Sequence, residues 1–384
     1  MSESKLIGKE FLGKYKIIKL IGKGGMESEV YLAETIHSKS NNHFSNKFKY
    51  TAIKFIKKTS TTTSDHWNRI LDEGVTNARL ATSEYIVKLY EMHPLDKDTI
   101  VLIMEYIDGP SLKELIRNRG CLSIPETLSI FKKILHGVSD MHTKERVIIH
   151  RDLKPENIML SKDLLDVKIA DFGISSVLVQ DNDIVKDVLT NETSFFGTIP
   201  YVTPDATSLQ SFDNKKMPML SKQYDFHALG IIFYEMLIGE KPFEIVDEND
   251  PSIILYWKKY DILPMKKINK NIRNEIENVF LKLTASRPNI MKYRYNDVSE
   301  IMNDIEEIES RISKKQEELP TILSYNQREY QQSLCLRLNS YSRNKFCKFI
   351  KSNKWLTINL FLFLLLVILL IIFISLGLLS WTEK

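Results

Sequence analysis

The chain has 384 residues and a net charge of +4, from 53 basic and 49 acidic side chains. This near-balance gives no sign of nucleic-acid binding. Three cysteines without a CxxC pair argue against a disulfide framework or a zinc site and indicate a reducing compartment. The length allows one domain of about 250 to 300 residues together with additional segments.

The N-terminal part of the chain has the pattern of an antiparallel sheet. Apolar and polar residues alternate around a glycine cluster over 15–34, which predicts a strand, a turn and a second strand. Further strands are expected at 50–56, 86–91 and 99–106, with a helix at 65–80. We therefore expect five strands and one helix in this part.

Beyond Gly109 the pattern becomes mostly helical. The spacing of apolar residues, a proline at one helix start and a glycine at another helix end support this prediction. Strands followed by helices indicate an α+β fold. Helices are expected at 111–117, 125–144, 222–239, 271–283 and 297–314.

The C-terminal segment is of a different kind, because residues 356–381 contain no charged side chain. A helix of that length spans about 39 Å, enough for a bilayer core of about 30 Å. The alternative is a buried core helix, but cores seldom need so long a helix that is apolar on all sides. We expect one transmembrane helix at 355–381, in contact with membrane lipid, and an extracytoplasmic tail at 382–384.

The segment before this span is basic, with seven basic residues and one acid over 321–354. It can be a solvated linker, but basic residues beside a membrane helix also stay on the cytoplasmic side. We therefore expect a basic juxtamembrane linker at 314–354. The expected protein is a single-pass protein of the cell membrane, with everything before the span in the cytoplasm.

A short stretch carries the residues of phosphoryl transfer. Residues 150–157 are His-Arg-Asp-Leu-Lys-Pro-Glu-Asn, and Asp171-Phe172-Gly173 follows fourteen residues after Asn157. Phosphoryl transfer needs a carboxylate to accept a hydroxyl proton, a lysine against phosphate, and oxygen ligands for a divalent metal. All three are present in this stretch.

A glycine-rich turn at 22–30 lies far earlier in the chain. Glycines let backbone N–H groups approach phosphate oxygens closely. An ordinary glycine-rich hairpin is the alternative for the turn alone. In chain order, this turn, Lys54, the 150–157 stretch, Asp171-Phe172-Gly173 and the 197–205 segment resemble the bacterial Ser/Thr protein kinases that share the eukaryotic fold.

The resemblance covers residues 15 to about 312 and implies a bilobal protein kinase fold. An N-terminal tail (1–14) would precede a catalytic domain (15–313), whose N-lobe is the five-stranded sheet with one helix and whose C-lobe is mainly helical. It implies ATP and Mg²⁺, with Mn²⁺ as an alternative metal, and protein substrates with Ser or Thr. Since the chain stops after the membrane helix, we expect a member without extracellular PASTA sensor repeats.

The resemblance also implies catalytic roles, residue by residue. Asp152 resembles the base for the substrate hydroxyl, and Lys154 resembles the γ-phosphate contact. Lys54 resembles the lysine on the α- and β-phosphates, and Glu73 is its expected partner. Asp72 is less favoured as that partner because it faces about 100° away on the helix. The expected metal ligands are Asn157 and Asp171.

The resemblance implies that the adenine ring of ATP lies between Ile21, Val30, Ala52 and Met159, below the glycine-rich turn. Backbone groups of residues 105–107 would contact the edge of the adenine, and Met104 would be the gatekeeper. Relative to the family pattern the turn contains one inserted residue, Glu27, which together with Glu29 places acidic side chains near the phosphates. The expected ATP-binding residues are Ile21, Gly22, Lys23, Gly24, Gly25, Met26, Glu27, Ser28, Glu29, Val30, Ala52, Lys54, Glu105, Ile107 and Met159.

Five further residues resemble structural supports of the site. Arg151 would bind a phosphorylated activation loop, and Thr198 would hydrogen-bond near the base and the lysine. Asp205 would pair with Arg294, and Asp225 would hold the catalytic loop. The candidate phosphosites are Thr193, Ser194 and Thr190.

We expect homodimerisation and trans-autophosphorylation, because tethering raises the encounter frequency of two chains. Two other functions remain open at this stage. One is a catalytically weak scaffold with the kinase fold, and the other is a small-molecule phosphotransferase.

Overall fold

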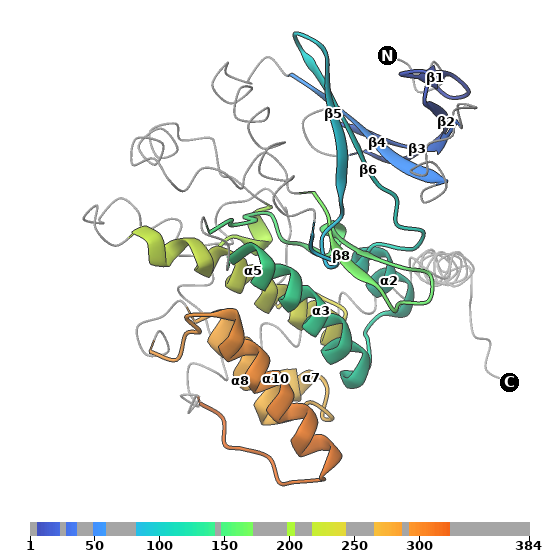
Figure 1. The fold of residues 1–384 in the computed structure, drawn as a ribbon. Coiled ribbons are helices and arrows are strands. Elements are labelled where there is room, and N and C mark those ends of the chain that lie inside the picture. The colour runs from blue at the N-terminus through green and yellow to red at the C-terminus, as the bar shows by residue number, and fades with distance from the viewer. Residues whose placement is uncertain are drawn as a thin grey trace, which may run out of the picture. The chain divides into compact units, whose positions relative to one another are not determined.

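The computed structural model describes residues 6–23, 28–36, 49–58, 82–142, 147–171, 198–203, 217–242, 265–285 and 292–322. In this part of the chain, an antiparallel sheet is followed by a helical region (Figure 1). The strand order of the sheet is β1-β2-β3-β4-β6-β5. Its strands are β1 (Glu10–Phe11), β2 (Tyr15–Lys23), β3 (Glu29–Thr35), β4 (Tyr50–Lys57), β5 (Leu89–Asp96) and β6 (Thr99–Glu105).

The prediction of five strands is wrong by one, because β1 adds a sixth strand. Two residues are too few to show a period-two pattern, so β1 could not be predicted from periodicity. The strand expected at 86–91 also begins later, at Leu89, since Ile86 instead forms an isolated parallel bridge with Ile169. The helix expected at 65–80 lies outside the described residues.

The sheet is curled, so that residues on non-neighbouring strands meet. The Tyr15 hydroxyl on β2 donates a hydrogen bond of 2.9 Å to the Glu91 carboxylate on β5, although β3, β4 and β6 lie between the two strands in the sheet. One face of the sheet encloses a core of side chains that include Tyr31, Ile53 and Ile103. The opposite face is therefore the one that is available to a ligand.

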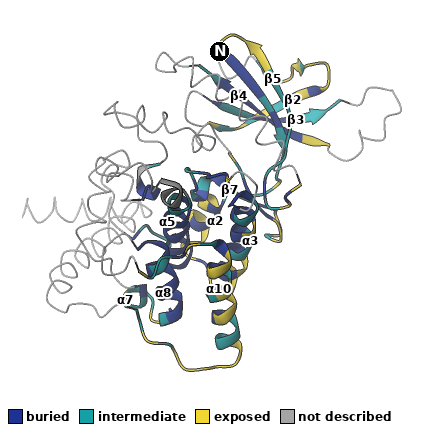
Figure 2. Ribbon diagram, turned by 60° about the vertical axis from the view of Figure 1, so that its left-hand side comes forward, coloured by how far each residue is buried: buried dark blue, intermediate teal, exposed yellow. Residues whose placement is uncertain are grey.

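All five helices expected beyond Gly109 are present, with ends that differ by up to five residues, and the short helix α7 was not expected. Ser111 caps α2 through a capping box with Glu114, and Gly239, with a φ of 85°, follows the end of α5. α5 is buried from Asp225 to Leu237, whereas α10 keeps an exposed face (Figure 2). The helices are α2 (Leu112–Arg119), α3 (Ile124–His142), α5 (Met217–Ile238), α7 (Met265–Ile268), α8 (Asn274–Leu283) and α10 (Val298–Ser313).

A segment between β4 and β5 joins the sheet to the helical region. The Ile169 amide donates to the Tyr85 carbonyl at 2.8 Å, and the Ser83 hydroxyl donates to Asp140 on α3 at 2.5 Å. Gly137 on α3 permits this contact, because a Cβ there would lie 3.1 Å from the Tyr85 carbonyl oxygen. These bonds anchor the N-terminal part of the domain on α3.

Residues 316–322, which we call the C-terminal strap, lie against α8. The Asn278 side chain donates to the Pro320 carbonyl and accepts from the Ile322 amide, both at 3.0 Å. Further hydrogen bonds run from Asn274 to the Leu319 carbonyl and from the Leu319 amide to Glu275. The compact unit extends to Leu323 and so includes the C-terminal strap.

None of the helices in the described ranges has the length and apolar character needed to cross a bilayer. The transmembrane helix expected at 355–381 lies outside those ranges.

Candidate active site

A two-stranded hairpin, β7 (Ile158–Leu160) paired with β8 (Val167–Ile169), positions two of the predicted residues. Ile158 pairs with Ile169, and the Ala170 amide donates to the Asn157 carbonyl at 2.7 Å. Asn157 and Asp171 therefore lie at the same open end of the hairpin, although fourteen positions separate them in the chain.

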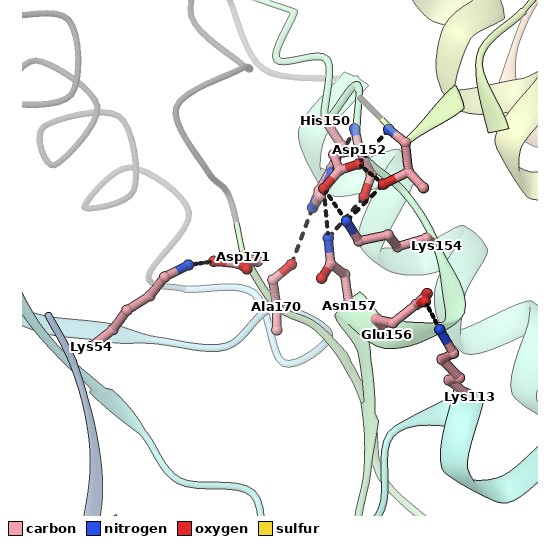
Figure 3. Close-up of polar contacts among 10 residues, drawn as sticks. Lys54, Lys113, His150, Asp152, Lys154, Glu156, Asn157, Ala170 and Asp171 are labelled. Carbon is pink, nitrogen blue, oxygen red and sulfur yellow. Dashed lines mark hydrogen bonds and ion pairs between the residues drawn. The ribbon is translucent and has the colours of Figure 1, made fainter. Parts of the chain in front are cut away.

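The Asp152 carboxylate is held on both of its oxygens (Figure 3). The Lys154 ammonium donates to Oδ2 at 2.7 Å, and the Thr198 hydroxyl donates to Oδ1 at 2.9 Å. The Lys154 ammonium also donates to the Thr198 hydroxyl oxygen at 2.8 Å. The Asn157 amide donates to the Asp152 carbonyl at 2.8 Å. The structure thus brings four sequence-predicted residues into one hydrogen-bonded cluster.

Asp225 on α5 holds the backbone of the 150–157 loop. Its carboxylate accepts the backbone amides of His150 and Arg151, each at 3.0 Å, and the His142 ring nitrogen at 2.8 Å. Arg151 has a φ of 63°, a strained value for a residue with a side chain. The two amide bonds hold that conformation. Burial would raise the pKa of Asp225, but the hydrogen bond and charge of His142 keep it below its ordinary value.

Lys54 on β4 reaches across to Asp171 and forms an ion pair with its carboxylate (Figure 3). Lys54 is buried, whereas Asp171 has a φ of 60° and a side chain that is 42% exposed. Loss of hydration acts to raise the pKa of Asp171, but the Lys54 ammonium holds it below its ordinary value. Asp171 is therefore ionised and faces the lysine that the sequence assigned to phosphate. The expected partner Glu73 lies outside the described residues.

Strand register decides which side chains face this lysine. Val30 pairs with Lys54, and directly paired residues of an antiparallel sheet lie on the same face. Ala52 lies two residues from Lys54 and is also on that face. Two other expected ATP-binding residues are also described. Ile21 lies on β2 with an exposed side chain, and the half-buried Met159 lies on β7.

The register also changes the expectation for Glu29. Its Cα pairs with Phe55, so its side chain shares the face of Tyr31 and lies opposite Val30. The Tyr31 hydroxyl donates to the Glu29 carboxylate at 2.8 Å. Glu29 therefore points away from the face that carries Lys54, contrary to the expectation that it lies near the phosphates. The inserted residue Glu27 lies outside the described residues.

The donor set fits a hard divalent cation. Asp171 offers carboxylate oxygens and Asn157 an amide oxygen, the ligand type that Mg²⁺ prefers while it keeps several waters. In the described ranges no group of three or more His, Cys, Asp or Glu side chains could hold a metal. Asp171 and Asn157 are the two described residues that would hold such a metal, through the carboxylate and the amide oxygen.

Comparison with known proteins decides the family. A family model described as "protein kinase domain" matches residues 15–339. The chain belongs to the bacterial family of eukaryotic-type serine/threonine protein kinases. A protein assigned as a serine/threonine-protein kinase in Mycoplasma genitalium is 34% identical over 317 residues, 78% of this chain and 81% of that protein.

Two further relatives support the assignment. Serine/threonine-protein kinase PrkC of Bacillus subtilis is 30% identical over 300 residues, 78% of this chain and 41% of the relative. Serine/threonine-protein kinase PknB of Mycolicibacterium smegmatis is 26% identical over 295 residues, 76% of this chain and 42% of the relative. The kinase is thus an enzyme with the bilobal kinase fold.

Other predicted residues of the kinase lie outside the described ranges. One of them is Asp205. Its expected partner Arg294 is described and donates from Nε to the Ala285 carbonyl. The others are Gly24, Gly25, Met26, Glu27, Glu73, Thr190, Thr193 and Ser194.

Sequence reasoning missed two ion pairs beside the site of the kinase. Lys168 on β8 pairs with the side chain of Glu105, which was expected only as an ATP-binding residue, and Lys113 on α2 pairs with Glu156 in the catalytic loop. Neither lysine belongs to a recognisable motif. A lysine in a short strand is usually solvated, so only the tertiary contact reveals these pairs.

Proposed function

We propose that this kinase transfers the γ-phosphate of ATP to Ser and Thr hydroxyls of proteins, with Asp152 as the catalytic base. The observation that carries the proposal is the fixed Asp152 carboxylate, which accepts from Thr198 on Oδ1 and from Lys154 on Oδ2. A carboxylate held in one orientation can accept the proton of an acceptor hydroxyl as that oxygen attacks phosphorus.

Lys154 and Lys54 would supply positive charge where phosphate charge gathers. Lys154 lies beside the base, and Lys54 lies on the ligand face of the sheet. Asn157 and Asp171 would hold Mg²⁺ or Mn²⁺, which neutralises phosphate charge when bound. The residues of the chain thus act by positioning and by charge stabilisation, as phosphoryl transfer requires.

The test is phosphate incorporation from labelled ATP by the full chain, followed by phosphoamino-acid analysis. We expect phosphoserine or phosphothreonine with wild type. In Asp152→Asn the rate of phosphate incorporation should be at least about 100-fold lower. Asp98→Asn, on the exposed turn between β5 and β6, is the matched control and should keep its activity. Equal labelling by wild type and Asp152→Asn would remove Asp152 as the base. Absence of labelling in wild type would favour the scaffold.

We further propose that phosphorylation of the activation loop in trans, within a dimer, activates the kinase. The candidate sites Thr193, Ser194 and Thr190 would bind Arg151, whose guanidinium has a pKa lowered by burial. A phosphate nearby would compensate for that loss of hydration. If activity per molecule does not change with surface density on supported bilayers, trans-activation is excluded.

Membrane anchoring through 355–381, with the catalytic domain in the cytoplasm, is proposed from the apolar run and its basic flank. The full chain should resist alkaline extraction from membranes. Replacing Leu365 and Ile368 by arginine should abolish this resistance to extraction, because each charge at the centre of a membrane helix raises the free energy of insertion by about 3 kcal/mol. If the double variant stays in the membrane as firmly as wild type, residues 355–381 are not the anchor.

A further inference from the structure

A half-buried ion pair connects β8 to the end of β6. The Lys168 ammonium lies 2.9 Å from Glu105 Oε2, and the two side chains are only 13% and 17% exposed. Glu105 is the last residue of β6, and the chain from there to α2 carries the backbone expected to contact adenine. The pair therefore fastens the β7–β8 hairpin to the start of that connection.

Lys168 also shares a face with the expected floor of the adenine site. Met159 on β7 pairs directly with Lys168 on β8, so the two side chains project to the same side of the hairpin. An isolated bridge between Ser111 and Met159 holds the other end of the connection to the hairpin. The connection from Glu105 to Ser111 is thus attached to the hairpin at both ends, by Lys168 and by Met159.

Glu105 is constrained on its other side by Lys88. The Glu105 amide donates to the Lys88 carbonyl at 2.8 Å, and the Lys88 amide donates to Glu105 Oε2 at 3.3 Å. The carboxylate that accepts from Lys168 therefore belongs to a residue whose backbone amide is also hydrogen-bonded, to Lys88. Movement of the side chain would move the backbone that the ligand is expected to contact.

A second ion pair links the same two segments and shows why burial matters. Lys162, between β7 and β8, lies 2.7 Å from Asp108 in the connection to α2, but these side chains are 75% and 60% exposed. Exposed pairs contribute little to stability because water screens them. The Glu105 carboxylate is shielded from most water, so it keeps much of its desolvation penalty when its partner is lost. The Lys168–Glu105 pair is therefore the more constraining of the two.

We propose that Lys168 is a positioning residue for adenine nucleotides. By holding Glu105, it fixes the backbone of the β6–α2 connection over Met159 and so prepares the adenine site before ligand binds. The inference rests on the proposed use of ATP. It concerns binding of the base, and it does not alter the role of Asp152 in the transfer step.

The test uses the full chain, with ADP and Mg²⁺ as the binding probe and with steady-state phosphotransfer to a protein acceptor. Lys168→Met should raise the dissociation constant of ADP and the KM for ATP by about tenfold. The kcat and the KM for the protein acceptor should stay within about twofold of wild type. Lys168→Arg should restore nucleotide affinity, and Lys162→Met should behave as wild type.

A purely structural role would lower kcat and stability without a selective change in KM for ATP. Unchanged ADP affinity in Lys168→Met would overturn the inference, and so would an equal loss of affinity in Lys162→Met. If Lys168→Met does not fold, the neutral pair Lys168→Met with Glu105→Gln replaces it, and the same tenfold loss is expected. Failure of wild type to label a protein acceptor would instead reject the proposed function itself.

Discussion

The hydroxyl of Thr198 donates a hydrogen bond of 2.9 Å to the carboxylate of Asp152, although 46 positions separate the two residues in the chain. The Thr198 amide bonds the same carboxylate oxygen at 3.0 Å. A residue beyond the undescribed segment 172–197 thus helps to set the orientation of the proposed base. A shift of Thr198 would therefore change the orientation of the Asp152 carboxylate.

Removal of this hydroxyl should slow catalysis without unfolding the protein. We expect Thr198→Val to lower kcat by about 10- to 100-fold, because misplacement of a reacting group weakens the proximity effect. Thr198→Ser keeps the donor and should stay close to wild type. Steady-state kinetics with saturating ATP measures both variants. A Val variant as fast as the Ser variant would show that the bond to Asp152 has no catalytic effect.

Asp225 should carry a large part of the stability of the catalytic loop. We expect Asp225→Ala to lower the free energy of unfolding by about 3 to 5 kcal/mol, since it removes one partner of a buried, hydrogen-bonded pair. Urea denaturation checks this, with the exposed Asp98→Ala as control. A loss below about 1 kcal/mol would contradict the prediction.

The same residue should give a defined acid dependence. Burial opposes ionisation of Asp225, but His142 lowers its pKa below the ordinary 3.8. The unfolded chain therefore binds the proton more readily, and the stabilisation is complete above pH 3.8. It is lost as the pH falls through the lower pKa of the folded state. Denaturation at pH values from about 5 down to about 2 should show this slope in wild type, below pH 3.8, and a smaller one in Asp225→Ala.

Glu235 on α5 should have the opposite pH dependence. Burial raises its pKa from 4.5 to about 7, although Lys241 and a hydrogen bond from Tyr201 oppose the shift. The folded protein holds a proton that the unfolded chain releases between pH 4.5 and 7, so this contribution to stability falls as the pH rises. Glu235→Gln should therefore gain stability relative to wild type across that window, by up to about 3 kcal/mol.

The measurement for Glu235 is urea denaturation at pH 4.5, 6 and 8. Glu306→Gln, an exposed change on α10, is the control. Its difference in unfolding free energy from wild type should be the same at all three pH values. If the difference between Glu235→Gln and wild type does not vary with pH, the carboxyl of Glu235 does not titrate in this range.

The C-terminal strap should contribute to the stability of the catalytic domain. Asn278→Ala removes two hydrogen bonds to the strap, so we expect a loss of about 2 kcal/mol. Asn303→Ala, on the exposed face of α10, should change stability by less than about 0.5 kcal/mol. Equal effects of the two changes would place the strap outside the cooperative unit.

Local patterns account for much of the fold. The helices except the short α7, and most strands of the large sheet, follow from periodicity, and the family follows from the order of the motifs. β1 was missed because it is too short, and the strap was missed because residues 314–322 have the polar composition of a linker. Its attachment to α8 depends on asparagine side chains that bind its backbone, and no periodicity reports such bonds.

The sequence by itself determined the kind of chemistry, because Asp152, Lys154 and Asn157 are close in the chain and their spacing is local. It also determined the family, through the order of motifs from the glycine-rich turn to the 197–205 segment. Only the tertiary structure decided which distant groups meet. Lys168 holds Glu105 and Glu29 turns toward Tyr31 because strand register and burial set those contacts, and both depend on the whole fold.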